Sequence, residues 1–481
     1  MQPSQQRTID RVRDHVAQVW DNEIVAALCE YITIPNVSAA FDADWAANGH
    51  MHRATGLIAN WCAGRAIAGL NVEVIELPRL SPLIIVEVPP TAGHDSNETV
   101  LLYGHLDKQP EMTGWREGLG PWTPVIDSGR LYGRGGGDDG YSAFAALTAI
   151  EAIERAGGSH ARCVVLIEAS EESGSIDLPA YVEHLATRLG NVALVICLDS
   201  GAADYDHLWV TSSLRGLVGG TLTVTVLDEG LHSGMASGVV PSSFRIIRQL
   251  LDRVEHASTG RILLPKLHTD IPHDRRMGAV ATAKTVGRPL ADEFNLAGGT
   301  QPMADDPVEQ LLNTTWRPTL SYTGIDGFPP TNRAGNVLRP STSLKLSFRL
   351  PPTCDADRAV AAVAAALTTD VPSNATASFD HVEFTAGWNA PSFAPWLVDA
   401  LDDASRATFG TPARSFGEGG SIPFMSMLGH RFPAAQFVVT GVLGPGNNAH
   451  GPNEFIDLVT AARVTSVIAL LLDRHASVVG G

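Results

Sequence analysis

Residues 99–107 read TVLLYGHLD, an apolar run that ends in a histidine and an aspartate two positions apart. The β-branched and aliphatic side chains of this run predict a strand that is buried on both faces of a sheet. Similar short runs recur along the chain, namely PLIIVEV from Pro82, CVVLIEA from Cys163, VALVICL from Val192 and QFVVTGV from Gln436. The sequence therefore predicts several buried strands of one sheet.

Helices are predicted before and between these runs. The segment YSAFAALTAIEAIERAGG from Tyr141 is rich in alanine, has apolar residues at helical spacing and ends in Gly157 and Gly158, a typical helix stop. Residues 9–31 show the same apolar spacing. Strands that alternate with helices indicate an α/β domain with a mostly parallel sheet and helices on both faces.

The pattern changes from about Gly216. The segments GLVGGTLTVTVLD and, from Thr342, TSLKLSFRLPP alternate with period two, which predicts half-exposed antiparallel strands. The residues from Val240 predict a helix, and the Gly-, Pro- and Asp-rich residues 260–310 predict loops. We therefore expect an inserted α+β domain. The expected boundaries are 1–213 and 385–481 for the first domain and 214–384 for the insertion.

Composition excludes some partners. The 481 residues include 34 Lys and Arg against 52 Asp and Glu, a formal net charge of −18. A negative surface repels phosphate backbones and anionic lipids, so we expect neither nucleic acid nor membrane as a partner. The N-terminus lacks an apolar signal core, and the five cysteines show no CxxC spacing. A reduced, cytoplasmic protein is the expectation.

Acidic and imidazole side chains follow the predicted strands of the first domain. They are His105 and Asp107, Glu171 and Glu172, Asp199, and, about ten residues beyond the last run, His450. The crevice outside the carboxyl ends of parallel strands is where such sheets bind ligands. Each residue alone is explained as an ordinary surface or core side chain, but their shared placement indicates a site.

The local backbone geometry suggests which of these side chains bind metal and which orient a ligand or transfer a proton. In an extended segment His105 and Asp107 share a face, so the carboxylate can orient the imidazole toward a metal ion. Glu171 and Glu172 point in opposite directions if their segment is extended. One can then bind metal while the other stays free for proton transfer.

A glycine-rich stretch, GRGGGDDG at 133–140, formally satisfies the dinucleotide pattern GxGxxG. Asp138 and Asp139 within it would repel a pyrophosphate, so an oxidoreductase is the less favoured reading. The same carboxylates suit cations. The full candidate ligand set is His105, Asp138, Glu172, Asp199 and His450. Two imidazoles and three carboxylates without cysteine suit a pair of divalent ions bridged by one carboxylate, which predicts a two-metal hydrolase.

The motifs GHLDKQP, GRGGGDD, EASEESGS, CLDSG and NNAHGPNE occur in this order and together resemble the M20 family of co-catalytic zinc peptidases. The branch with the greatest similarity is the carnosinase-type, cytosolic non-specific dipeptidases. The resemblance covers nearly the whole chain. It implies a zinc-peptidase-like catalytic domain, with the insertion serving as lid and dimerisation domain.

The resemblance also implies the roles of individual residues. Asp138 would bridge two ions, most simply Zn²⁺ with Mn²⁺ or Co²⁺ as alternatives. His105 and Asp199 would complete one ion site, and Glu172 and His450 the other. Glu171 would be the general base for a metal-bridging water, Asp107 would brace His105, and His232 would stabilise the oxyanion. The implied substrate-binding residues are Arg349, Asn336, Ser421, Gly419 and Gly420.

Two positions depart from the family pattern. Gly140 stands where lysine is usual, and Asn336 stands where threonine is expected in similar proteins. Neither position is an implied metal ligand, so the departures concern substrate choice more than reaction type.

The implied reaction is hydrolysis of the amide bond of a dipeptide or similar small substrate with a free carboxylate. The resemblance favours a homodimer in which His232 reaches the partner's site, and the alternating strand TLTVTVLDEG from Thr221 is a candidate edge for pairing. The alternative is an N-acyl-amino-acid deacylase of the same family, of the acetylornithine deacetylase or succinyl-diaminopimelate desuccinylase type. A non-catalytic relative is a further reading, and the free carboxylate of Glu171 argues against it.

Overall fold

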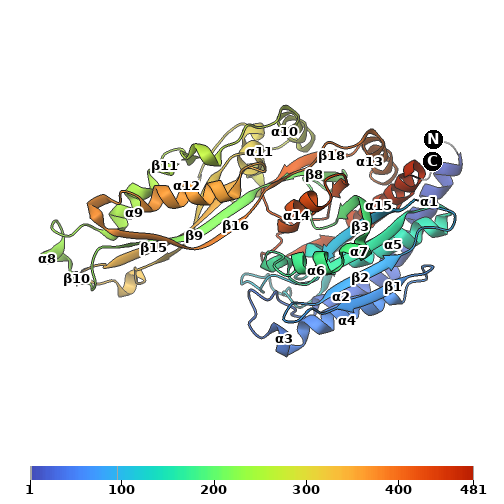
Figure 1. Ribbon diagram of the computed structural model, residues 1–481, viewed down its shortest axis with the longest axis horizontal. Helices are drawn as coiled ribbons and strands as arrows, with labels where there is room; N and C mark the ends of the chain where they lie inside the picture. Colours follow the sequence, from blue (N-terminus) through green and yellow to red (C-terminus); the bar gives the residue numbers. More distant parts are fainter. Residues whose placement is uncertain (1–2, 95, 480–481) are drawn as a thin grey trace. The chain divides into compact units, whose positions relative to one another are not determined.

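The computed structural model describes residues 3–94 and 96–479, and its chain divides into two compact units (Figure 1). Unit 1 consists of Met1–Thr211, Ala390–Phe416 and Met427–Gly481, and unit 2 of Ser212–Asn389 and Gly417–Ser426. The segment Gly417–Ser426 groups with unit 2, although the sequence pattern predicted it in the last part of the first domain. None of the helices in the described residues is both long and apolar enough to cross a membrane.

Unit 1 contains a six-stranded sheet in the order β1-β2-β6-β3-β7-β19. The strands are β1 (Asn71–Ile75), β2 (Leu83–Val88), β3 (Glu98–His105), β6 (Arg162–Glu168), β7 (Asn191–Cys197) and β19 (Gln436–Val439). β3 pairs in parallel with β6 and β7, and β19 pairs in parallel with β7, whereas β1 and β2 form an antiparallel margin. The expected α/β class with a mostly parallel sheet is confirmed.

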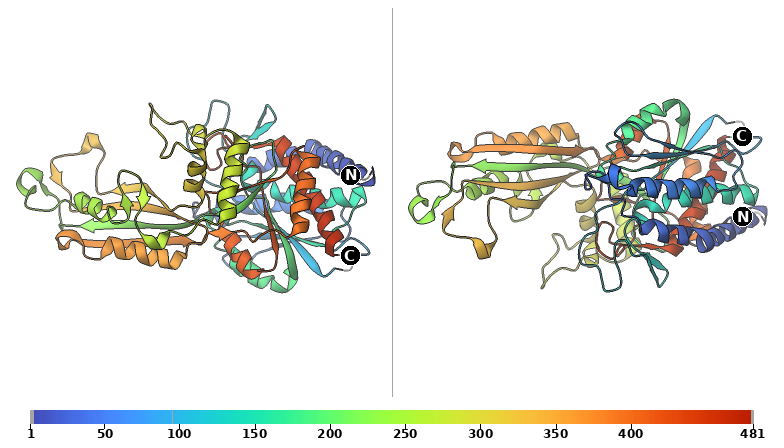
Figure 2. Two further views of the ribbon diagram at one scale, coloured as in Figure 1. Left: turned by 90° about the horizontal axis from the view of Figure 1, so that it is seen from above. Right: turned by 90° about the horizontal axis from the view of Figure 1, so that it is seen from below.

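Helices complete the core of unit 1. They are α1 (Pro3–Val19), α2 (Val25–Ile32), α4 (His50–Ala63), α5 (Ser142–Ala156), α13 (Pro395–Thr408) and α15 (Leu458–Val479). Alternate side chains of β3, including Val100 and Leu102, are buried among these helices, and the intervening Leu101 and Tyr103 are buried on the other face. α1, α5 and α15 pack side by side (Figure 2). A sheet buried on both faces explains why its strands are uninterrupted apolar runs.

The ends of these helices follow the predicted signals. α5 ends at Gly157, which has a φ of +82°, a backbone conformation that favours glycine. The helical spacing at 9–31 corresponds to α1 and α2, joined by a π-helical segment, η1 (Trp20–Ile24). The sequence thus located these helices correctly within a few residues.

Unit 2 is built on a four-stranded antiparallel sheet in the order β13-β15-β9-β16. Its strands are β9 (Gly216–Thr225), β13 (Thr319–Asp326), β15 (Ser341–Leu350) and β16 (Thr376–Thr385). Side chains such as Leu222 and Phe348 form a core with α9 (Ser243–Leu251) and α12 (Ala356–Thr368). The other face carries polar residues, as period-two alternation requires.

Two expectations for this region are wrong. The strand from Thr221 is not an edge, because β9 is paired with β15 on one side and with β16 on the other, so β13 and β16 are the edges. Residues 260–310 are not only loops, because they include α10 (His273–Val286) and short 3₁₀ turns. Just one residue of α10, Thr282, is buried, so this helix shows no apolar stripe in the sequence.

Candidate metal centre

His105 ends β3 at a point where the backbone is closely packed. A Cβ atom on the preceding Gly104 would lie 2.0 Å from Ser142 Oγ and 2.6 Å from Asp139 Oδ2, so only glycine fits there. The His105 backbone N–H donates to Asp139 Oδ2 at 3.1 Å. These contacts fix the place where the fully buried imidazole leaves the sheet.

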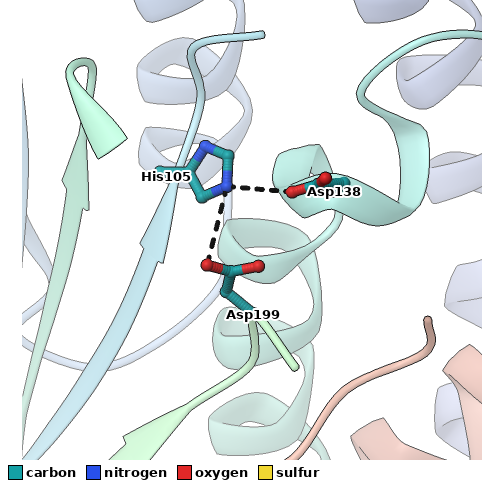
Figure 3. A group of neighbouring side chains, drawn as sticks. All are labelled: His105, Asp138 and Asp199. Atoms are coloured by element: carbon teal, nitrogen blue, oxygen red, sulfur yellow. Dashed lines mark hydrogen bonds and ion pairs between the residues drawn. The ribbon is translucent and has the colours of Figure 1, made fainter. Parts of the chain in front are cut away.

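The imidazole of His105 lies between carboxylates. Its Nε2 atom is 3.3 Å from Asp138 Oδ1 and 3.8 Å from Asp199 Oδ2 (Figure 3). Its Nδ1 atom is 3.1 Å from the carbonyl oxygen of Asp107 and 3.4 Å from that residue's Oδ1. Asp107 thus contacts the imidazole on the side away from the other two carboxylates.

A second group adjoins the first. His450 Nε2 lies 3.0 Å from Asp138 Oδ2 and 3.3 Å from Glu172 Oε2. Within each group, His105, Asp138 and Asp199 or Asp138, Glu172 and His450, the candidate ligand atoms all lie within 4.8 Å of one another. Asp138 directs one carboxylate oxygen into each group. The five residues predicted as ligands therefore converge, with Asp138 as the shared member.

Burial and crowding alter the protonation of the second group. Burial and the neighbouring Asp138 raise the pKa of Glu172 to about 8. The His450 side chain is 55% exposed, and its partial loss of hydration would lower its pKa, but the hydrogen bond to Asp138 and the charge of Glu172 raise the pKa to about 9. Burial opposes ionisation of Asp138 too, yet His105 and His450 hold its pKa below the usual range. Protons thus supply positive charge that the carboxylates require.

The donor set fits divalent cations. Three crowded carboxylates with two imidazoles, and no thiolate, match the ligand preference of zinc, manganese and related ions. An ion would replace the protons on the imidazoles and on Glu172, and it would remove the repulsion between the carboxylates. The geometry is therefore that of a candidate two-ion centre.

Glu171 and Glu172 lie on a tight turn and not on an extended segment. Glu171–Ser173 form one 3₁₀ turn, η3, so the expected strand-like opposition of the two side chains is wrong. The backbone N–H groups of Glu171 and Glu172 donate to the two carboxylate oxygens of Asp107, at 3.1 Å and 3.0 Å. Glu172 belongs to the second group, and Glu171 belongs to neither group.

The surroundings of Glu171 are acidic. Burial, followed by the charge of Asp199, raises its pKa well above the usual range. Among the described residues Glu171 is therefore a carboxyl group beside both metal groups that is not part of either. That position suits a group that takes up and releases a proton.

A buried ion pair joins the two loops that carry Asp138 and His450. The Arg134 guanidinium and the Glu454 carboxylate are paired, and both side chains are almost completely buried. The same carboxylate accepts a hydrogen bond from the Gly135 N–H at 2.7 Å, and Arg134 donates to the Gly451 carbonyl at 3.0 Å. This pair fixes segments that are far apart in the sequence.

The predicted substrate-binding residues fall into two places in unit 2. In the first place, Arg349 Nη1 donates to Ser421 Oγ at 3.1 Å, and Ser421 Oγ donates to the carbonyl of Arg215 at 2.6 Å. The Arg215 N–H donates to the Gly420 carbonyl, and its Nε donates to the Gly419 carbonyl, both at 3.0 Å. Four predicted residues therefore meet around Arg215.

Arg215 was not among the predicted residues. Its signal in the sequence is a single cationic residue inside the otherwise apolar run SSLRGLVGG from Ser212. A charged side chain in a buried segment is costly unless it has a partner, which makes such a position a candidate functional residue. Its side chain is only 8% exposed.

His232 and Asn336 meet in the second place. They lie next to the short paired strands β10 (Leu231–His232) and β14 (Val337–Leu338), and Ser233 N–H donates to the Asn336 carbonyl at 2.9 Å. Figure 1 shows β10 beyond the C-terminal end of β9, the end that is away from Gly216. Arg349 pairs with Leu217 near the start of β9, and Ser341 pairs with Thr225 at its end. His232 and Arg349 are therefore at opposite ends of this sheet.

Comparisons with known proteins identify the family and similar chains. The sequence model of peptidase family M20/M25/M40 matches residues 101–474. The cysteinylglycine-S-conjugate dipeptidase of Corynebacterium striatum is 27% identical over 372 residues, covering 75% of this chain and 77% of that protein. The Beta-Ala-His dipeptidase of Homo sapiens is 26% identical over 392 residues, covering 76% and 73%.

Two solved structures have a similar fold. Human carnosine dipeptidase 1 superposes with a TM-score of 0.78 at 22% identity, covering 98% of this chain and 99% of that one. The di-peptidase Dug1p from Saccharomyces cerevisiae also gives a TM-score of 0.78, at 21% identity, with coverage of 98% and 99%. The fold is thus shared over nearly the whole of each chain.

Proposed function

Because the chain belongs to peptidase family M20/M25/M40, we propose that it is a two-metal dipeptidase, which hydrolyses the amide bond of dipeptides with a free carboxylate. The observation that carries this proposal is the pair of three-residue groups that share Asp138. The names of similar proteins, a cysteinylglycine-S-conjugate dipeptidase and a Beta-Ala-His dipeptidase, favour a dipeptide over an N-acyl amino acid as substrate.

One ion would be held by His105, Asp138 and Asp199, and the other by Asp138, Glu172 and His450. Zinc is the first candidate, with manganese or cobalt as alternatives. Bound there, divalent ions supply Lewis-acid polarisation of the scissile carbonyl and lower the pKa of the attacking water.

Glu171 is the proposed general base. Its carboxylate accepts a proton from the attacking water as the carbon–oxygen bond forms. It returns that proton to the amine nitrogen as the carbon–nitrogen bond breaks. Asp107 supports this step, because its carboxylate accepts the backbone N–H of Glu171 and fixes the turn.

Arg349 is the proposed partner of the substrate's carboxylate. Burial lowers its pKa, but no ion pair to a carboxylate of the chain is found in the part that the structure describes. Ser421 holds the guanidinium in place at 3.1 Å. A guanidinium and a carboxylate can form two parallel hydrogen bonds, which fix the substrate's orientation as well as its affinity.

We infer that His232 acts in the site of a second subunit. Arg349 and the far end of β15 are eight residue steps apart, about 26 Å at 3.3 Å per residue, and His232 lies next to that far end. A dipeptide spans only about 7 Å. The Arg349 and His232 of one chain therefore cannot both contact one dipeptide, and a homodimer with composite sites resolves this.

The function is tested by assaying the metal-free protein, reconstituted with zinc, manganese or cobalt, on a panel of dipeptides and N-acyl amino acids. Hydrolysis of dipeptides that chelators abolish supports the proposal, and cleavage of N-acyl amino acids alone would replace it with a deacylase. The shared site is tested by mixing His232→Ala chains with Glu171→Gln chains. Activity should partly return, and no recovery despite proven subunit exchange contradicts the composite site.

A further inference from the structure

Unit 2 contains a cavity of about 950 Å³ beside the Arg349 cluster, which is the group of Arg349, Ser421, Gly419 and Gly420 that meets around Arg215. None of the residues predicted from the sequence lines this cavity. Its walls come from β12 (Arg261–Ile262), residues 268–271, α10, the loop before α11 (Pro307–Thr315), α11 itself and the start of β13. Apolar side chains such as Trp316 and Ile262 cover much of it, and Arg215 lies in its wall. The volume is within the range of cavities that bind small molecules.

Arg215 is the buried cation of this wall, and it lacks a counter-charge among the described residues, whereas Arg261, which also lines the cavity, is exposed. Its guanidinium donates to the Gly419 carbonyl at 3.0 Å and to Thr319 Oγ1 at 3.2 Å, both neutral groups. Its side chain is 8% exposed, and it forms no ion pair with a carboxylate of the described residues. The arginines Arg276 and Arg317, which also line the cavity, differ because both contact Glu309.

A second polar group in the wall also lacks a partner. The Thr269 hydroxyl is buried and forms no hydrogen bond within the described part of the chain. A buried hydroxyl without a partner costs free energy that a polar ligand atom would recover. The sole acidic residue of the lining is Asp270, which is exposed. Within the part of the chain that the structure describes, the positive charge of Arg215 has no counter-charge, and the Thr269 hydroxyl has no hydrogen-bond partner. Together they favour an anionic ligand with acceptor oxygens.

The cavity and the Arg349 cluster share an element. Thr319 lines the cavity, accepts a hydrogen bond from Arg215, and lies directly opposite Arg349 in the pairing of β13 with β15. Residues opposite each other in an antiparallel pair point to the same face of the sheet. The two guanidinium groups are thus close enough that Arg349 lowers the pKa of Arg215, second only to burial.

We propose that this cavity receives the side chain of the substrate's C-terminal residue and that Arg215 selects an acidic one. This inference rests on the proposed dipeptidase function. Arg349 binds the main-chain carboxylate, and Arg215 binds a second carboxylate on the side chain of the same residue. Two negative charges then neutralise the buried guanidinium of Arg215 and the half-buried guanidinium of Arg349, and the apolar wall contacts the methylene groups of the side chain.

The test compares Gly-Glu, Gly-Gln and Gly-Leu as substrates of the metal-reconstituted enzyme. We expect kcat/KM to be at least about tenfold higher for Gly-Glu than for Gly-Gln, mainly through KM, the size expected of one charge-assisted hydrogen bond. Arg215→Met should abolish this ratio, and Arg215→Lys should keep part of it. Arg358→Met, which removes an exposed cation on α12 of the same unit, is the matched control and should keep the ratio.

Binding of free L-glutamate and L-glutamine, measured by calorimetry on the wild-type enzyme, gives a readout that requires neither turnover nor a folded variant. Tighter binding of glutamate supports the assignment. Equal binding, or a preference for Gly-Glu that persists in folded Arg215→Met, overturns it. Absence of any dipeptide hydrolysis contradicts the proposed function, and the calorimetric comparison then still decides what the cavity binds.

Discussion

Three carboxylates converge at the candidate metal centre of unit 1, whereas two guanidinium groups converge beside the cavity of unit 2. Both places collect buried charge of one sign. They differ in whether the groups can lose their charge near neutral pH. A carboxyl group can become neutral, because the pKa of Glu172 rises to about 8. Burial lowers the pKa of Arg215 only to about 10, so this guanidinium stays charged near neutral pH.

The difference has a structural counterpart. The acidic residues of unit 1 are carried on separate loops and turns that protons and the Arg134–Glu454 pair hold together. Arg215, which cannot discharge, is held by the backbone carbonyls of Gly419 and Asn313 as well as by Thr319. The acidic centre can take up protons when no cation is bound, because the pKa of Glu172 is raised. The guanidinium of Arg215 stays charged and therefore needs fixed hydrogen-bond acceptors around it.

The largest expected effect is on kcat and comes from removing the proposed general base, Glu171, while the proposed metal ligands stay intact. Glu171→Gln should lower kcat by about 10⁴-fold, the upper range for loss of a general base, because an amide cannot accept the proton. Metal analysis should still find two ions per chain. Loss of one ion in this variant would show that the roles of Glu171 and Glu172 are exchanged.

Metal removal should affect the two units unequally. Ions that bind only the folded state at a thousand times their dissociation constant stabilise it by about 4 kcal/mol. Dialysis against a chelator should therefore lower the hydrogen-exchange protection of β3, which ends at His105, and of β7, which ends two residues before Asp199, and leave that of β9 and β15 unchanged. Equal loss of protection in both sheets would contradict the assignment of the ions to unit 1.

Removal of one charge from the arginine pair should weaken substrate binding without loss of metal. Arg349→Met should lower kcat/KM about 100-fold, mostly through KM, because two charge-assisted hydrogen bonds to the substrate's carboxylate are lost. Arg349→Lys should recover part of the loss, and the metal content should not change. An unaltered KM in Arg349→Met would remove this residue from the substrate site.

The smallest effect tests how unit 1 tolerates a carboxyl group without a cation. Glu168, at the end of β6, is fully buried and accepts hydrogen bonds from Tyr103, Ser170 and Ser175. Burial raises its pKa to about 7. Because the folded state holds the proton more tightly than the unfolded state, this contribution to stability is complete below about pH 4.5 and is lost as the pH rises through about 7.

Glu168→Gln should therefore raise the free energy of unfolding by about 2 kcal/mol at pH 8 and leave it nearly unchanged at pH 4.5. Urea unfolding followed by tryptophan fluorescence, in the presence of a chelator, measures this difference. Glu183→Gln, an exposed change on α6 (Leu178–His184), is the control. A variant that is less stable than the wild type at pH 8 would show that Glu168 is held ionised.

The sequence predicted most of unit 1 because its signals are local. The uninterrupted apolar runs became the strands of the sheet, and the polar residues at their ends converged, since parallel strands end at one edge. β1 and β16 were not predicted. Both are edge strands whose residues are mostly exposed, so their composition is not that of a buried strand.

Contacts between distant segments account for the other misses. Arg215 becomes significant only when the Gly419–Ser421 loop, two hundred residues later, packs against it. The turn at Glu171 is set by the carboxylate of Asp107, which the local sequence of the turn does not contain. Hydrophobic periodicity reports only the pattern within one segment of the sequence. Both contacts join segments that are far apart in the sequence, so periodicity could not predict them.

The position of His450 has a consequence for the order in which the centre is assembled during synthesis. His105, Asp138 and Asp199 leave the ribosome before His450 and Glu454, which come more than 200 residues later in the chain. Closure of the longer loop has the larger entropic cost and waits for the last segment. A nascent chain would therefore bring together His105, Asp138 and Asp199 early, whereas the group of Asp138, Glu172 and His450 would form only once the segment that carries His450 has docked.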